Sequence, residues 1–192
     1  YAIDLIAMAF AFPIALFPFL AAELDAPWAL GLLYSAGAVG SLAVSLTSGW
    51  TASVHRQGRA IAVSAALWGG AIALVGMTTS LPVVLLLLVI AGGADMSSGI
   101  FRSTMWNQTI PPDVRGRMAG IEMLSYSIGP LLGQVRSSAA ASRWSLRASL
   151  ASGGILCIAG VALASVSMPA LWRYDDRTSI DAQRERDRRG LS

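Results

Sequence analysis

The sequence predicts an all-α membrane protein with six transmembrane helices. Three observations point to this class. Hydrophobic residues make up 55% of the 192 residues and charged residues only 13%, whereas soluble chains carry nearer about 25% charged residues. The mean hydropathy is +0.60. The apolar residues also gather into six stretches of the length, about 20 residues, that a helix needs to cross a bilayer.

Each predicted span is an apolar stretch bounded by a short polar or proline-bearing segment. The spans cover about residues 4–22, 29–50, 59–79, 82–101, 117–141 and 148–171. The segments between them read ELDAPW, TASVHRQGR, TSLP, STMWNQTIPPDVRG and SRWSLR. The second and fifth spans are the least hydrophobic. We therefore divide the chain into a transmembrane domain over residues 1–171 and a charged tail over residues 172–192.

Helix-breaking residues interrupt two of these spans. Pro13 and Pro18 lie within the first span, and Gly129 and Pro130 lie near the middle of the fifth. A proline removes one hydrogen bond from the helix and bends it. Interrupted helices of this kind are more typical of transporters than of rigid anchors, so we expect a break at both places.

Small residues recur four positions apart in the second span, as in Ala36 and Gly40 and in Gly37 and Ser41. This spacing lets two helix backbones approach closely in lipid. Tight packing alone would explain the pattern, and a sliding helix interface in a moving protein is the functional alternative.

The distribution of arginines predicts the orientation of the bundle. One face carries Arg56, Arg59, Arg102, Arg115, Arg117 and the arginines of the tail, whereas the other carries only Arg136, Arg143 and Arg147. Loops rich in arginine stay on the cytoplasmic side of a membrane. We therefore expect a multi-pass protein of the cytoplasmic (inner) membrane with both ends of the chain in the cytoplasm. The tail is expected to be disordered or to lie along the surface, with Trp172 and Tyr174 as interfacial anchors.

The loops carry a family resemblance. HRQGRA (55–60) follows the second span and PPDVRGRMAG (111–120) follows the fourth. Together with ALFPFLAAEL, GLLYSAGAVGSLAVSLTSGW and FRSTMWNQTIPPDVRGRMAG, they resemble the C-terminal half of a major facilitator superfamily transporter, in the branch of the enterobactin exporters and multidrug effluxers. The resemblance implies a twelve-helix bundle of two halves, each built from two inverted three-helix repeats. It also implies proton-driven export by alternating access.

The same resemblance marks the cytoplasmic loop motifs. In the superfamily, the loop after the second span of a half reads Gly-x-x-x-Asp-Arg-x-Gly-Arg. Here His55 stands where the acid is expected, so a role of this loop that depends on the acid is not supported. The matching residues are Arg56, Gly58 and Arg59 in this loop, with Asp113, Arg115, Gly116 and Arg117 in the loop after the fourth span.

Several charges fall at bilayer depth, where a charge is costly and so faces a partner or a wet cavity. Asp95 lies within the fourth span, and Arg102 follows about 10 Å further along the same face of the helix. A direct contact would be stretched, so we expect a water or a neighbouring helix to complete the link. We predict a charged cluster that closes an inner gate, formed by Asp4, Asp95, Arg102, Arg115, Arg117 and Glu122.

Some of these residues have a second interpretation. Asp95 or Glu122 could take up a proton to drive export, because burial disfavours the charged form of a carboxyl group. Arg136 could meet an anionic substrate such as a catecholate siderophore, or it could reach out to the membrane surface. Phe17 and Met96 could line an apolar substrate path, although such residues more often pack or face lipid.

The sequence gives no sign of an enzyme, since it has no nucleotide-binding loop, metal-ligand spacing or Ser/His/Asp set, and its one cysteine excludes an intrachain disulfide. We expect a secondary transporter that exports small amphipathic molecules such as siderophores by proton antiport. Its partners would be the bilayer, the substrate and an N-terminal six-helix half, with no cofactor, metal or nucleic acid. The alternatives are efflux of drugs or macrolides and, in another class, a six-span scaffold or oligomeric pore.

Overall fold

The computed structural model is helical throughout the part of the chain that it describes, which confirms the all-α class. It describes residues 2–172, 174, 175, 179 and 183, without the side chains of residues 112, 113, 124 and 170, so most of the predicted tail lies outside the described residues. The helices are α1 (Ala2–Ala11), α2 (Phe17–Glu23), α3 (Leu30–Leu46), α4 (Gln57–Met77), α5 (Leu81–Thr109), α6 (Pro112–Arg143), α7 (Leu146–Ser167) and α8 (Pro169–Trp172). Short 3-10 turns cover Ile14–Leu16, Pro27–Ala29 and Ser48–Ser53.

Five helical stretches, rather than the six predicted, are long and apolar enough to cross a membrane. Within the described residues these are Ala2–Glu23, Pro27–Leu46, Gln57–Met77, Leu81–Thr109 and Leu146–Ser167. The predicted span over residues 117–141 corresponds to α6, a helix of 32 residues. It falls short in hydropathy because serines, Gln134 and Arg136 interrupt its apolar residues. α6 nevertheless packs lengthwise on α1 and α7.

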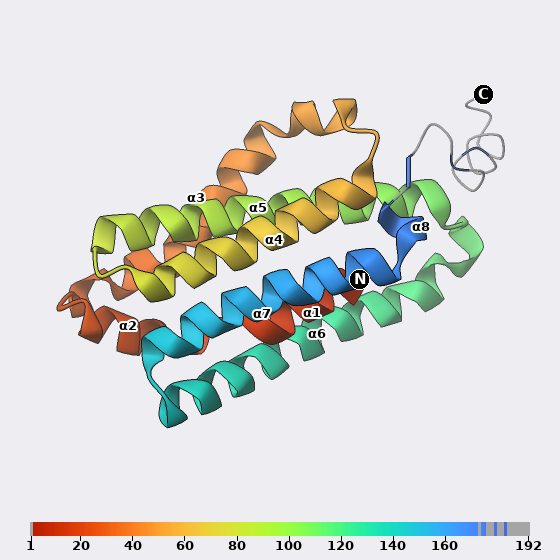
Figure 1. Cartoon of the computed structure of the whole chain (residues 1–192). Coiled ribbons are helices and arrows are strands. Elements are labelled where there is room, and N and C mark those ends of the chain that lie inside the picture. Colours follow the sequence, from red (N-terminus) through yellow and green to blue (C-terminus); the bar gives the residue numbers. More distant parts are fainter. Residues whose placement is uncertain (1, 173, 176–178, 180–182, 184–192) are drawn as a thin grey trace.

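The long helices form two groups of three. α3, α4 and α5 pack together in one group, and α1, α6 and α7 pack together in the other (Figure 1). Extensive packing of α4 on α7 joins the groups, whereas α1 and α5 do not pack closely on one another within the described residues. We call the end of the bundle where α1 begins and α7 ends the termini end. The turns after α2, α4 and α6 lie at the opposite end.

Close approach of α3 to α5 depends on small residues. A Cβ added to Gly40 would overlap the Val89 carbonyl, and one added to Gly92 would overlap the backbone of Gly37. The Ser41 hydroxyl donates to the Gly92 carbonyl across the same interface, at 3.0 Å. The spacing of small residues in the second predicted span thus corresponds to tight helix packing.

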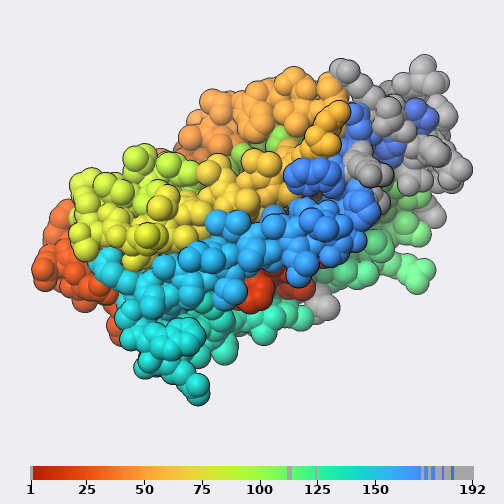
Figure 2. All heavy atoms as spheres, in the orientation of Figure 1, coloured from red at the N-terminus to blue at the C-terminus, as the bar shows by residue number. Residues whose placement is uncertain are grey.

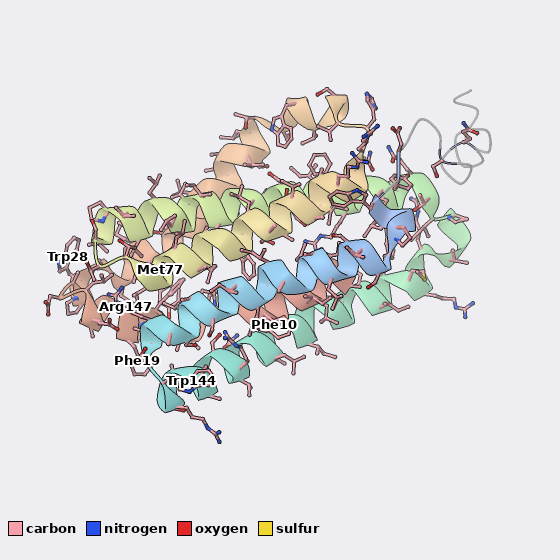
Figure 3. The ribbon with its side chains drawn as sticks, in the orientation of Figure 1. Phe10, Phe19, Trp28, Met77, Trp144 and Arg147 are labelled. Atoms are coloured by element: carbon pink, nitrogen blue, oxygen red, sulfur yellow. The ribbon has the colours of Figure 1, made fainter. Side chains whose placement is uncertain are left out.

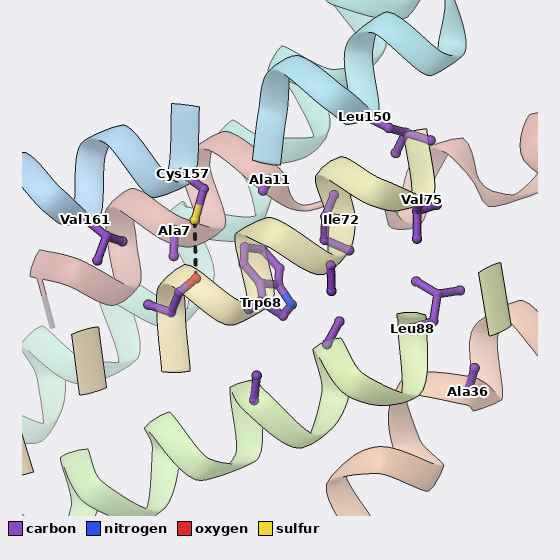
Figure 4. Close-up of a cluster of buried hydrophobic side chains, with 14 of the residues drawn as sticks. Ala7, Ala11, Ala36, Trp68, Ile72, Val75, Leu88, Leu150, Cys157 and Val161 are labelled. Carbon is purple, nitrogen blue, oxygen red and sulfur yellow. Dashed lines mark hydrogen bonds between the residues drawn. The ribbon is translucent and has the colours of Figure 1, made fainter. Parts of the chain in front are cut away.

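The buried core lies between α4 and its neighbours. Trp68 is 9% exposed, in a cluster with Ile72 and Leu88 (Figure 4). Cys157 of α7 is fully buried, and its Sγ lies 3.6 Å from the Ala65 carbonyl of α4. The cysteine therefore helps to pack α7 on α4.

The two predicted breaks have different outcomes. α1 ends at Ala11, just before Pro13, and a 3-10 turn leads into α2. Pro18 occupies the first turn of α2, where the missing N–H has no helical acceptor to lose. α6 runs without interruption through Gly129 and Pro130, because a membrane helix tolerates one lost hydrogen bond when neighbouring helices support it. Gly129 is buried against the Met8 side chain of α1.

Exposed aromatic residues lie near the opposite end of the bundle. Trp28 and Trp144 are 74% and 72% exposed, and Figure 3 shows both near that end, with Phe19 and Met77. Exposed tryptophans at this level match the interfacial belt of membrane proteins. Arg147 forms an ion pair with Glu23 and donates to the Thr78 carbonyl. Arg147, one of the few arginines expected on the face opposite the cytoplasm, therefore links the turns after α2 and α4 to the start of α7.

Candidate functional site

A central cavity of about 230 Å³ lies where the break after α1 faces α3, α4 and α5. Its walls include Phe17, Tyr34 and Trp68, and the rings of Phe17 and Tyr34 meet edge to face with centroids 5.3 Å apart. Ser41 adds a polar group. Among the described residues of the lining, Asp95 alone carries a charge. The site can therefore accept an apolar or aromatic molecule and offers it one carboxylate.

Asp95 is half-buried and lines this cavity. Among the described residues, no donor forms a hydrogen bond or an ion pair with its carboxylate. The small space behind it, about 10 Å³, is shared with Trp68, Asp4 and Ser98. That is close to the space that one water molecule occupies. Asp95 thus stands between the central cavity and Asp4.

Asp4 of α1 and Arg102 of α5 form a buried ion pair. Their side chains are 5% and 6% exposed. Arg102 also donates from Nε to the Ser98 carbonyl at 3.4 Å, and its guanidinium lies 5.6 Å from the ring centroid of Tyr126 on α6. The acid that pairs with Arg102 is therefore Asp4 of the neighbouring helix α1. Asp95, on the same helix as Arg102, is not in the pair.

The ion pair separates two cavities. An end cavity of about 190 Å³ opens at the termini end, and its lining includes Asp4, Arg102 and Trp106. Asp4 also borders the small space behind Asp95. Asp4 and Arg102 therefore lie between the central cavity and the termini end.

Two predicted members of the charged cluster lie elsewhere. Arg115 donates to the carbonyls of Ile110 and Asn107, at 3.1 and 3.2 Å. These carbonyls belong to the C-terminal end of α5, which attracts cations because its last carbonyls lack helical donors. Arg117 is exposed. Glu122 is half-buried on α6, one turn before Tyr126, so it lies near Arg102 without a described contact to it.

Comparison with known families decides the class of the protein. A profile of the Major Facilitator Superfamily matches residues 3–192. The chain belongs to the Major Facilitator Superfamily. It is therefore a multi-pass membrane protein of a family of secondary transporters, not an enzyme. No curated protein and no solved structure matches the chain.

The first superfamily loop motif anchors the start of α4. Gly58 lies against the Leu171 carbonyl, and a Cβ at this position would overlap it. Arg59 donates from Nε to the Trp172 carbonyl at 3.3 Å, and its guanidinium lies 5.3 Å from the Trp172 ring centroid. Arg56 is exposed. The glycine and second arginine of the motif therefore hold α8 on α4 without the acid that His55 replaces.

The second loop motif shows fewer contacts. The side chain of Asp113 lies outside the described residues. Gly116 is exposed, and a Cβ added there would meet nothing within 4 Å. Of this loop, only Arg115 has a described role, as a cap on α5.

Arg136 binds the broken end of α1. It donates to the Phe10 and Ser149 carbonyls at 2.9 and 3.1 Å and to the Ser152 hydroxyl at 2.6 Å. The last carbonyls of a helix lack intrahelical donors. The Ser137 hydroxyl donates to the Phe12 carbonyl, just beyond the end of α1, at 3.3 Å. Arg136 is thus held between α1 and α7, and it is not among the residues that line the central cavity.

Of the two apolar residues expected to line a substrate path, one lines the central cavity and the other does not. Phe17 lines the central cavity, whereas Met96 is half-buried and lies outside its lining. Tyr34, Ser41 and Trp68 line the cavity but were not predicted as site residues. Nothing in one sequence distinguishes them from packing residues, because their role depends on which helices meet at the break after α1.

Proposed function

We propose that this chain is the C-terminal half of a proton-coupled exporter of small amphipathic molecules. The observation that carries the proposal is the Asp95 carboxylate on an aromatic-walled cavity, where no described residue forms an ion pair with it. A half-buried carboxylate can hold either a proton or a cationic group of a substrate. Exchange of one for the other at the same carboxylate would couple efflux to proton entry. An N-terminal six-helix half would complete the cavity.

The cavity favours a basic amphipathic cargo over an anionic siderophore. Aromatic rings and one carboxylate attract a molecule with a flat apolar body and a positive charge. A catecholate would need a cation in the lining, and Arg136 is instead bound to carbonyl groups of α1 and α7. We therefore rank drug-like cations, the multidrug branch, ahead of siderophores, and both ahead of an uncoupled scaffold or pore.

The Asp4–Arg102 pair supplies the gate in this proposal. We assign the termini end to the cytoplasm, in the inner membrane, because most of the arginines that the structure describes lie there. The ion pair then closes the route from the central cavity to the cytoplasm. Cargo entering from the cytoplasm would require Asp4 and Arg102 to separate.

Transport by the full protein in inverted membrane vesicles tests this function. A lipophilic dye cation and a catecholate siderophore are offered under an imposed pH gradient. We expect uptake of the cation by wild-type protein and loss of gradient-driven uptake in Asp95→Asn, together with weakened exchange of unlabelled for labelled cation, because the proposed carboxylate binds both proton and cargo. Asp25→Asn, in the turn after α2, is the matched control and should transport normally. Undiminished gradient-driven uptake by Asp95→Asn would remove Asp95 from coupling, and uptake of the siderophore alone would reverse the ranking of cargoes.

A further inference from the structure

A groove on the outer face of α4 and α7 takes no part in the site described above. Its volume is about 490 Å³, and α8 lies across its end. Its walls include Ala62, Val63 and Ala66 of α4, with Ala162 and Val166 of α7 and Trp172 of α8. Figure 2 views the face on which α4 and α7 lie side by side. The groove thus runs along the junction of the two helix groups.

The chemistry of the walls excludes most occupants. Val63 and Val166 at the rim are 60% and 80% exposed, so the surface around the groove is apolar. The hydroxyl of Ser165 also lines it but already donates to the Val161 carbonyl at 2.7 Å. An extended peptide would bring backbone N–H and C=O groups into an apolar place without partners for them, which is strongly unfavourable. A hydrocarbon chain brings none.

A fixed positive charge stands at the mouth of the groove. Arg59 is held by its hydrogen bond to the Trp172 carbonyl and by the face of the Trp172 ring. This hydrogen bond uses Nε, and the Nη groups of an arginine form the fork that binds a phosphate through two hydrogen bonds. Ala66 lies about 10 Å beyond Arg59 along α4, at a rise of about 1.5 Å per residue. A phospholipid has the same order of groups, with its charged phosphate at the surface and its apolar acyl chain deeper in the membrane.

We propose that this groove binds an anionic glycerophospholipid from the leaflet at the termini end. Arg59 holds the phosphate, Trp172 lies at the level of the glycerol backbone, and one acyl chain fills the groove between α4 and α7. Basic residues beside a membrane surface select anionic head groups in this manner. The bound lipid contacts both helix groups and α8, so it reinforces the contact that Gly58 and Arg59 make with α8.

Quenching of tryptophan fluorescence by brominated lipid tests the proposal on the full protein in lipid nanodiscs. Dibrominated phosphatidylglycerol or dibrominated phosphatidylcholine is titrated into an unbrominated phosphatidylcholine bilayer. The contribution of Trp172 is the difference between the protein and Trp172→Phe. We expect half-maximal quenching of Trp172 at a lower fraction of phosphatidylglycerol than of phosphatidylcholine. Arg59→Gln should weaken the preference by roughly tenfold, the effect of losing one charge-assisted contact, whereas Arg56→Gln in the same loop should leave it intact.

A second variant separates the acyl chain from the head group. Ala162→Phe fills the groove without altering Arg59, and it should abolish quenching of Trp172 by both lipids. Glycerol phosphate in solution should not displace the brominated lipid, because it lacks the chain. Equal quenching by both lipids in the wild-type protein, or an unchanged preference in Arg59→Gln, would overturn the proposal. Absence of Trp172 quenching in the wild-type protein would mean that protein, in place of lipid, covers the groove.

Discussion

Removal of Asp4 from the buried ion pair is the sharpest test of the charged site. Asp4→Asn keeps the size of the side chain and deletes its charge, which leaves Arg102 buried with a 6% exposed side chain and no opposite charge in direct contact. Breaking a buried pair from one side costs about 3–5 kcal/mol, because the remaining charge is uncompensated. For a chain of this size each kcal/mol lowers Tm by about 2–4 °C. Asp4→Asn should therefore lower Tm by roughly 6–20 °C.

A matched control comes from the other ion pair. Glu23 and Arg147 are 40% and 22% exposed, and ion pairs with such solvent contact contribute about 0–1 kcal/mol. Glu23→Gln should therefore lower Tm by no more than about 4 °C. The double variant Asp4→Asn/Arg102→Gln removes both buried charges, so it should be more stable than Asp4→Asn alone.

Thermal unfolding of the purified full protein in mild detergent provides the readout. A thiol-reactive dye can follow the transition, since Cys157 is fully buried in the folded bundle and becomes reactive only when α7 separates from α4. Two results would refute the reasoning. One is a Tm for Asp4→Asn equal to that of Glu23→Gln. The other is a double variant as unstable as the sum of its single changes, which would show that Asp4 and Arg102 contribute independently.

Three further predictions concern packing, the broken helix and topology. Gly92→Ala should prevent stable accumulation of the protein in membranes because its Cβ would overlap the backbone of Gly37, whereas Gly37→Ala, whose Cβ meets nothing within 4 Å, should accumulate normally. Arg136→Gln should cost about 1.5–3 kcal/mol in a thermal melt, because it removes charged donors from the Phe10 carbonyl and its neighbours; an equal Tm with a raised KM for cargo would instead indicate substrate binding. Ser145→Cys, in the turn before α7, should react with an impermeant maleimide from outside intact cells; labelling only after lysis would reverse the proposed orientation.

Patterns along the chain predicted the helical class and most of its spans. Long apolar runs and their polar boundaries are local properties, and α4 and α7 begin within two residues of the predicted starts. The chain between Leu46 and Gln57 was less predictable. An apolar continuation suggested one span to residue 50, but the helix gives way there to a 3-10 turn over Ser48–Ser53.

Partners across helices could not be predicted from one sequence. The spacing of Asp95 and Arg102 predicted a shared helix face, but which acid meets Arg102 depends on how α1 and α5 lie in space. Arg136 is a second residue whose partner the sequence did not predict. Its target is a backbone carbonyl at Phe10, and sequence does not reveal which carbonyl a break will leave without a donor. The superfamily motif at residues 55–60 marked the start of α4 as important, but its contact with Trp172 of α8 required the structure.

The sparse packing between α1 and α5 has a thermodynamic consequence. Arg102 extends from α5 to both Asp4 of α1 and Tyr126 of α6, while α1 and α5 share little close packing within the described residues. Separation of α1 from α5, with α4 still packed on α7, would part charges and expose little hydrocarbon. Since heat capacity increases with exposed apolar area, the difference in heat capacity between the joined and parted states would be small. The enthalpy of opening would then be almost constant with temperature, and the balance between the two states would vary gently from cold to warm conditions.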